Sequence, residues 1–227
     1  MRYNELPAEP LNEPKFLCGF DHEKRLPPPN QLAHHKKEWH LNFEEEVETD
    51  EHYLTAMAFI SRLEPTRLKC IDLPGEDCVW RPRRAFGATF HVGEKRTPLH
   101  VINAHIDPHA AIAEQLAQHR ALLDYADTYD RREPVTLLGD FNTLSRRSRR
   151  EMRELLESRG FRTPFRTGVT TWRAGLIRLH ADWIFVREGR SDDEKECIKA
   201  RIMRHGVARG LRVSDHFPVW IELEIEA

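Results

Sequence analysis

The 227-residue sequence lacks the features that mark membrane and secreted proteins. No run of apolar residues approaches the length of about 20 that a membrane-spanning helix needs. The first seven residues, Met1 to Pro7, hold no apolar stretch of the kind that a secretory signal requires. We therefore expect a cytoplasmic protein with no membrane span.

Cysteine is scarce, and its four copies lie far apart, at Cys18, Cys70, Cys78 and Cys197. No two of them form a Cys-x-x-Cys pair, and no spacing of Cys and His indicates a hydrolase with a cysteine nucleophile. Reduced thiols are the expected state. A bridge between Cys70 and Cys78 is the alternative, but no pattern supports it.

Excess charge of one sign is also missing. Lys and Arg total 35 and Asp and Glu total 37, for a net charge of −2 and an isoelectric point near 6.7. This balance argues against bulk electrostatic binding to nucleic acid, although it allows a local basic patch. The length and the absence of repeats predict a single domain over residues 1–227, with residues 1–50 divergent and partly irregular.

Hydrophobic periodicity predicts many strands and few helices. Prolines make residues 1–35 irregular, apart from one short strand within 15–20. A helix is expected over 31–40, and the acidic run 44–51 is expected to be a solvated surface loop. Further strands are expected at 54–60, 84–92, 99–104, 135–138, 182–186 and 217–225, and helices at 112–126 and 145–159. This alternation predicts an α/β sandwich of sheets covered by helices.

Polar residues gather where four of these strands begin or end. Asn103-Ala104-His105 and Asp140-Phe141-Asn142 each end a strand, Asp182 begins one, and Ser214-Asp215-His216 precedes the last. Strand ends on one side of a sheet meet at one rim, so we expect these groups to share a site. Carboxylates, amides and imidazoles are the inventory that phosphodiester hydrolysis requires: hard ligands for a divalent ion, a base for water and donors for phosphate.

These motifs resemble the endonuclease/exonuclease/phosphatase superfamily, whose fold is that of DNase I. The resemblance rests on Asn103-Ala104-His105, Gly139-Asp140-Phe141-Asn142, the segment 182–186 and Ser214-Asp215-His216, in the family's order from about Leu54 onward. It implies a four-layer α/β/β/α sandwich with its site at one edge of two sheets. It also implies a phosphoesterase that depends on Mg²⁺ or Mn²⁺.

The resemblance further implies a role for each residue. Asp215 would be a metal-linked carboxylate, and His216 the catalytic imidazole, oriented by Asp182. Asp140 would orient or deprotonate the attacking water, and Asn142 would hold a phosphate oxygen or a metal-bound water.

Three more residues complete the implied site. His105 would donate to non-bridging phosphate oxygens with support from Asn103, and Trp172 would contact substrate. Taken singly, each residue of the site has an ordinary alternative as a turn residue, a surface histidine or a packed aromatic.

The start of the chain departs from the family pattern. The family's first strand ends in asparagine, and its second ends in a metal-binding glutamate. Neither feature is evident here. Tyr3-Asn4 is a weak candidate for the asparagine. Aligning the apolar run of Phe16 places Asp21 or Glu23 near the metal position. The chain is then either an active phosphoesterase with an altered metal site or a catalytically impaired relative that acts as a binding protein. A missing central strand would also expose sheet edges, which either a homodimer or an unusual N-terminal segment would cover.

Substrate identity stays open at this point. A phosphoester, with nucleic acid among the candidates, is the expected partner. Arginines are frequent after Asn142, at positions 146, 147, 149, 150, 153, 162, 166, 173 and 178. They either grip substrate phosphates or form a solvated helix face paired with glutamates.

Overall fold

The structure of the chain is a computed structural model that describes residues 16–18, 40–48, 54–75, 83–191, 197–210 and 214–226. Its largest sheet has five strands in the order β10-β7-β6-β5-β4. Their bounds are Arg67–Asp72 for β4, Arg84–Val92 for β5, Thr97–His105 for β6, Val135–Asp140 for β7 and Asp182–Arg187 for β10. Four of the polar residues singled out above lie on this sheet: Asn103, His105, Asp140 and Asp182.

The register of this sheet brings distant acids to one edge. Strands β6 and β7 run parallel, with His105 opposite Asp140, and β10 runs antiparallel to β7, with Asp182 opposite Asp140. A parallel pair needs a crossover connection, and α2 (Ile112–Ala126) supplies it. The ends of β6 and β7 and the beginning of β10 therefore form one rim.

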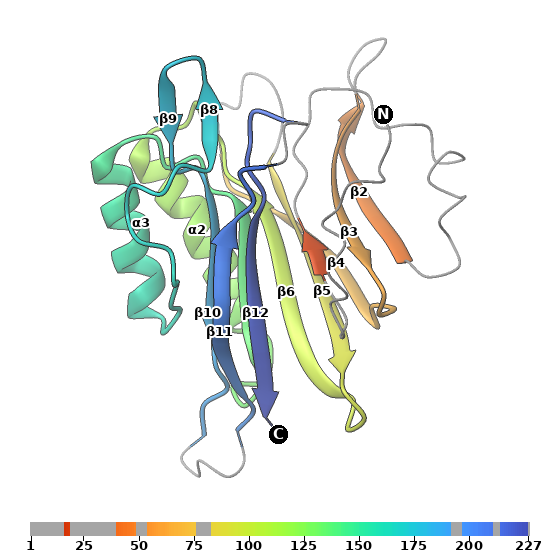
Figure 1. Cartoon of the computed structure of the whole chain (residues 1–227). Helices are drawn as coiled ribbons and strands as arrows, with labels where there is room; N and C mark the ends of the chain where they lie inside the picture. The colour runs from red at the N-terminus through yellow and green to blue at the C-terminus, as the bar shows by residue number, and fades with distance from the viewer. Residues whose placement is uncertain are drawn as a thin grey trace.

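Two helices cover one face of the sheet, α2 and α3 (Arg146–Ser158) (Figure 1). Ser145 caps α3, because its hydroxyl oxygen accepts a hydrogen bond from the Ser148 backbone N–H. Neither helix of the described part of the chain is long and apolar enough to cross a membrane.

Smaller sheets complete the sandwich (Figure 1). One is the antiparallel pair β11-β12, and another has the order β1-β3-β2. Their bounds are Phe16–Cys18 for β1, His40–Glu48 for β2, Leu54–Ser61 for β3, Lys199–Val207 for β11 and Val219–Glu226 for β12. Alternate residues of β12 pack against the core. Strands β8 (Trp172–Ala174) and β9 (Ile177–Leu179) form a separate hairpin.

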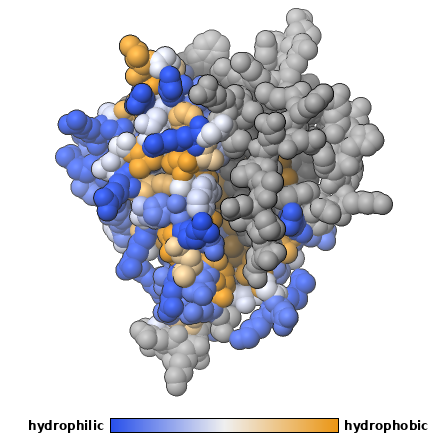
Figure 2. Space-filling model, in the orientation of Figure 1, coloured by the Kyte–Doolittle hydropathy of each residue, from blue (hydrophilic) through white to orange (hydrophobic). Residues whose placement is uncertain are grey.

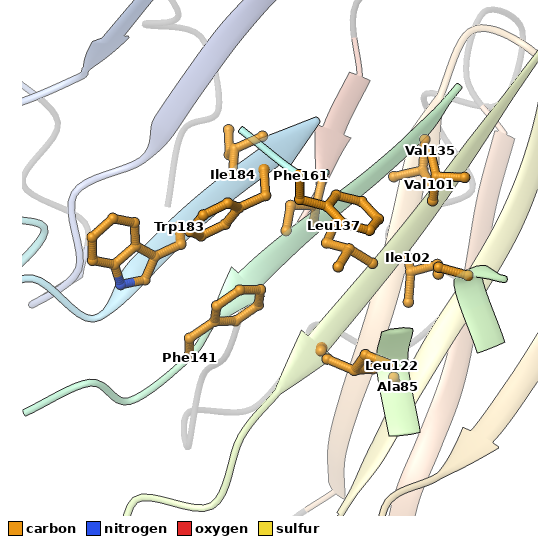
Figure 3. Packing of buried hydrophobic residues seen from close by; sticks show 14 of the residues in the cluster. Ala85, Val101, Ile102, Leu122, Val135, Leu137, Phe141, Phe161, Trp183 and Ile184 are labelled. Carbon is orange, nitrogen blue, oxygen red and sulfur yellow. The ribbon is translucent and has the colours of Figure 1, made fainter. Parts of the chain in front are cut away.

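The core is rich in aromatic residues near the rim (Figure 3). Trp183, Phe185 and Phe141 are fully buried, with ring centroids 5.6 Å apart for Trp183 and Phe185 and 6.1 Å apart for Phe141 and Phe185. Burying one such side chain contributes roughly 1.5–3 kcal/mol. Phe141 directly follows Asp140, and Trp183 directly follows Asp182. The packed core therefore restricts the motion of the rim.

The predicted strands at 54–60, 84–92, 99–104, 135–138, 182–186 and 217–225 and both later helices are confirmed to within a few residues. The prediction of a surface loop over the acidic run is wrong, because residues 44–48 belong to β2, which pairs with β3. Strands β4, β8, β9 and β11 were not expected. More than half of their residues are exposed and none of the four is a continuous apolar run, so pairing with a neighbour decides their conformation.

Several expectations fall outside the described residues. These are Asn4, Asp21, Glu23 and Cys78, together with the helix over 31–40 except for its last residue, which begins β2.

Candidate active site

Asp140, Asp182 and His216 meet at the rim. Each offers one ligand atom, and these three atoms lie within 4.8 Å of one another. Asp140 ends β7, Asp182 begins the neighbouring β10, and His216 precedes β12. The strand register therefore assembles a group whose members span 77 positions of the chain.

His216 has one ring nitrogen held by a carboxylate and one turned toward another. Its Nδ1 lies 2.9 and 3.0 Å from the two carboxylate oxygens of Asp182. Its Nε2 lies 3.9 Å from Asp140 Oδ2, too far for a direct hydrogen bond. The Asp182 contact places a proton on Nδ1, so Nε2 is the nitrogen available for chemistry.

Burial and charge tune the two groups that face each other. Burial, with the nearby charge of Asp182, raises the pKa of Asp140 to about 6, although His105 and His216 oppose this shift. Burial disfavours the His216 imidazolium, but the Asp182 hydrogen bond and the charges of Asp182, Asp140 and Asp215 raise its pKa to about 9. The rim thus holds a carboxylate that titrates near neutrality beside a protonated imidazole.

His105 lies opposite Asp140 in the parallel pair, so it faces the same rim. Arg83, directly before β5, donates from Nη1 to His105 Nδ1 over 3.0 Å. That contact leaves the His105 ring proton on Nε2. Arg83 was not among the predicted site residues, because no local motif marks it; only the pairing of β5 with β6 brings it to His105.

Asn142 and Asn103 both lie at the rim, and Asn142 connects its segments by hydrogen bonds. Asn142 adopts a left-handed conformation, with φ of 46°, and its Nδ2 donates to the Ile106 carbonyl over 2.7 Å. Its backbone N–H donates to Asp140 Oδ1 over 2.9 Å, which fixes that carboxylate. Asn103 is buried two residues below His105, beside Gly139.

Asp215 and Trp172 contact each other at the margin of the site. The Trp172 indole N–H donates to Asp215 Oδ2 over 2.9 Å, and Ser214 Oγ donates to Asp215 Oδ1 over 3.2 Å. Asp215 is exposed and does not belong to the group of three ligand atoms. The structure therefore brings Asp140, Asp182 and His216 together and leaves Asp215 beside them.

Thr171 connects the segments that carry these residues. It is fully buried, and its hydroxyl oxygen accepts from the backbone N–H groups of Ala181 and Asp182 over 3.0 and 2.9 Å. Its carbonyl accepts from the Phe217 N–H over 2.6 Å. Thr171 thus fixes Asp182 and the His216 segment at once; the Thr-Thr-Trp segment was its only signal in the sequence.

Most arginines at the start of α3 have partners on the same helix. Arg147, Arg150 and Arg153 pair with glutamates four residues later. Arg149 donates to the Thr143 carbonyl over 3.1 Å. For the three arginines paired with glutamates, the solvated-helix interpretation holds better than a grip on substrate.

The donor set at the rim fits a divalent metal ion in part. Mg²⁺ is usually held by one or two carboxylates, with waters and substrate oxygens completing six ligands. Asp140 Oδ2 accepts no hydrogen bond from the described residues and can serve as such a ligand, whereas both Asp182 oxygens contact His216 Nδ1. Asp140 is therefore the residue here best suited to hold the ion.

Comparisons with known proteins place the fold. Residues 9–216 match the Endonuclease/Exonuclease/phosphatase family. The human Nocturnin catalytic domain, solved with a bound sulfate anion, is 14% identical with a TM-score of 0.63, over 88% of this chain and 77% of that chain. Zebrafish (D. rerio) TDP2, complexed with a single-strand DNA product, is 17% identical with a TM-score of 0.63, over 93% and 86%.

A third solved structure is a mannosyl-6-phosphatase of Bacteroides thetaiotaomicron. It is 15% identical with a TM-score of 0.60, over 86% of this chain and 80% of that chain. No curated protein matches the sequence. At these identities the structural likenesses show the fold alone, and that fold is the DNase I-like α/β sandwich that the sequence predicted.

Proposed function

The chain belongs to the Endonuclease/Exonuclease/phosphatase family, and we propose that it is a metal-dependent phosphoesterase that hydrolyses phosphodiester bonds. One observation carries the proposal: His216, held at Nδ1 by Asp182, turns Nε2 toward the buried carboxylate of Asp140. A base and a proton donor in hydrogen-bond reach of one small space are what phosphoester hydrolysis by water requires.

Each residue then has a defined task. Asp140 orients the attacking water and accepts its proton, while Asn142 holds Asp140 through its backbone N–H. His216, kept protonated by Asp182, donates from Nε2 to a phosphoryl oxygen and stabilises the charge that develops there. His105 donates to a second phosphoryl oxygen from Nε2, because Arg83 occupies its Nδ1.

Asp140 is the described residue that would hold Mg²⁺ or Mn²⁺, and Asp215, Asp21 and Glu23 are the further ligands that the sequence predicts. When bound, the ion supplies positive charge to the phosphate and its leaving group. Trp172 and Asn103 remain predicted substrate-binding residues.

Nucleic acid is the substrate class we favour. The single-strand DNA product in the structure of TDP2 supports it, because that chain shares the fold over 93% of this one. A cytoplasmic location and a homodimer stay predictions from the sequence. A scattering profile of a monodisperse monomer would contradict the dimer.

The test is hydrolysis of bis-p-nitrophenyl phosphate and of supercoiled DNA with Mg²⁺, with Mn²⁺ and with chelator. Activity should require the metal and fall at least about a hundredfold in Asp140→Asn. The matched control is Asp130→Asn, which removes an exposed carboxylate paired with Arg132 at the other end of the sheet. A folded protein without turnover in any metal would instead support the impaired, ligand-binding alternative.

A further inference from the structure

The β8-β9 hairpin projects from the rim of the candidate active site (Figure 1). Its base is fixed to the segment that carries His216. The Arg173 N–H donates to the Asp215 carbonyl over 2.9 Å, and Trp172 forms a β-bridge with His216. The base of the hairpin is therefore held beside the segment that carries His216.

The outer part of the hairpin contributes little to the core. Ala174 pairs with Ile177 across a two-residue turn, Gly175-Leu176, and Gly175 has φ of 57°, the glycine conformation that such turns favour. Leu176 is 99% exposed and Ile177 is 59% exposed. Figure 2 shows apolar side chains at this tip, with hydrophilic ones beside them. Burial within this chain therefore does not explain the sequence of the hairpin.

Two arginines lie directly opposite each other on it. Arg173 pairs with Arg178 in the register of β8 and β9, and both are exposed. Side chains at paired positions of adjacent strands lie side by side, and like charges there are destabilising. Among the described residues no carboxylate pairs with either side chain. The Arg173 side chain donates from Nε to the Gly175 carbonyl over 3.3 Å. Three arginines of α3 differ, because Arg147, Arg150 and Arg153 are paired with glutamates.

We propose that Arg173 and Arg178 form a phosphate-binding subsite for a second phosphate group of the substrate. Two guanidinium groups at paired positions of the hairpin, with no carboxylate partner among the described residues, give the charge that a phosphate accepts, and the anion removes their repulsion. The proposal rests on the proposed function, since the first phosphate is the one cleaved beside His216. The second phosphate belongs either to the next nucleotide of a strand or to a small molecule with two phosphates.

Arg178→Glu is the decisive variant. It places a carboxylate opposite Arg173, so the hairpin gains a favourable cross-strand pair while the anion subsite is lost. The midpoint temperature of thermal unfolding should therefore be unchanged or slightly higher than in wild type. For an oligothymidylate substrate, KM should rise at least about tenfold with kcat within about twofold, because the interaction helps binding and not the chemical step. Hydrolysis of bis-p-nitrophenyl phosphate, which has a single phosphate, should stay within about twofold.

Binding without turnover separates this proposal from the proposed function. The probes are a fluorescein-labelled oligothymidylate, followed by anisotropy in chelator, and thymidine 3′,5′-bisphosphate as competitor. Arg178→Glu should weaken binding of the strand about tenfold and lower the slope of log K against log salt by about 0.7, the value for one phosphate contact on a single strand. Competition by the bisphosphate in wild type, lost in the variant, would assign the second phosphate to a small molecule.

The matched control is Arg162→Glu. It makes the same charge change at an exposed residue whose backbone is bonded to Val186, at the other end of β10. Equal losses in Arg162→Glu and Arg178→Glu would overturn the subsite, as would unchanged binding of both probes in Arg178→Glu. An inactive wild type whose binding still depends on Arg178 would refute the enzyme and keep the subsite.

Discussion

Two histidine–carboxylate pairs lie at opposite ends of the five-stranded sheet. At the rim, His216 contacts Asp182 at 2.9 Å; at the other end, His100 of β6 contacts Glu133 at 2.7 Å. The His100 ring also has Thr89 Oγ1 on Nδ1 at 2.9 Å and stacks on Tyr129, with 3.7 Å between centroids. Both nitrogens of His100 are thus occupied, whereas no described residue is hydrogen-bonded to Nε2 of His216.

The surroundings give the two rings opposite pKa shifts. Burial lowers the pKa of His100, although the hydrogen bond and charge of Glu133 oppose it. Three carboxylates around His216 outweigh burial and raise its pKa to about 9. A histidine–carboxylate pair is therefore no sign of catalysis by itself; an unoccupied nitrogen that faces a second acid is the distinguishing feature.

The largest expected effect is on turnover. His216→Ala should lower kcat for bis-p-nitrophenyl phosphate about a thousandfold, since it removes the proton donor. His100→Ala should leave the kcat of the folded protein unchanged but reduce the free energy of unfolding by about 2–4 kcal/mol, since it opens a cavity beside buried polar groups. Steady-state kinetics of both variants measures kcat, and urea unfolding measures the free energy of unfolding. Comparable kcat values in the two variants would remove the distinction between the pairs.

Close backbone contacts at the two ends give the second comparison. A Cβ at Gly139, where φ is 129°, would lie 2.0 Å from the Ala104 carbonyl oxygen, and one at Gly189 would lie 2.0 Å from the Arg132 oxygen. Gly139→Ala and Gly189→Ala should each destabilise the fold by roughly 3 kcal/mol or more. Only Gly139→Ala should also lower the activity of the folded fraction, because Asp140 follows directly. Gly210→Ala, where a Cβ has open space, is the control.

His216 and His100 should contribute to stability with opposite pH dependence. Urea unfolding in the presence of chelator measures it. The raised pKa of His216 gives stability that is complete below pH 6.5 and lost as pH rises through 9, on the order of 3 kcal/mol. The lowered pKa of His100 gives stability that is present above pH 6.5 and lost as pH falls. The difference between wild type and His216→Gln should therefore fade at alkaline pH, and that for His100→Gln at acidic pH. Parallel pH profiles for the two variants would contradict the assigned shifts.

The smallest effect concerns hydrogen bonds beside each pair. Trp172→Phe removes the donation to Asp215 and should lower kcat/KM about fivefold, in line with roughly 1 kcal/mol for one such bond. Tyr129→Phe removes the bond to the Tyr125 hydroxyl and should leave kcat/KM unchanged. Steady-state kinetics at equal folded fraction measures kcat/KM for both variants. A decrease in kcat/KM for Tyr129→Phe as large as that for Trp172→Phe would argue against a local effect.

Much of the fold followed from the sequence where one pattern dominated. Apolar strands such as 84–92 and 135–138, and the Ser145 cap with the helix after it, are set by local periodicity and hydrogen bonding. Strands β2, β4 and β11 were missed because the sequence of β2 is mostly polar and β4 and β11 have many exposed residues. Pairing with neighbouring strands, not composition, holds them.

The candidate site divides in the same way. The sequence alone supplied the residue types and their order: Asp140 after a buried strand, Asp182 before another, and His216 before the last. Only the tertiary structure decided which nitrogen of His216 faces Asp140, that Arg83 holds His105, and that Asp215 contacts Trp172. The physical reason is that strand register and hydrogen-bond geometry are set between segments far apart in the chain, and no local pattern encodes them.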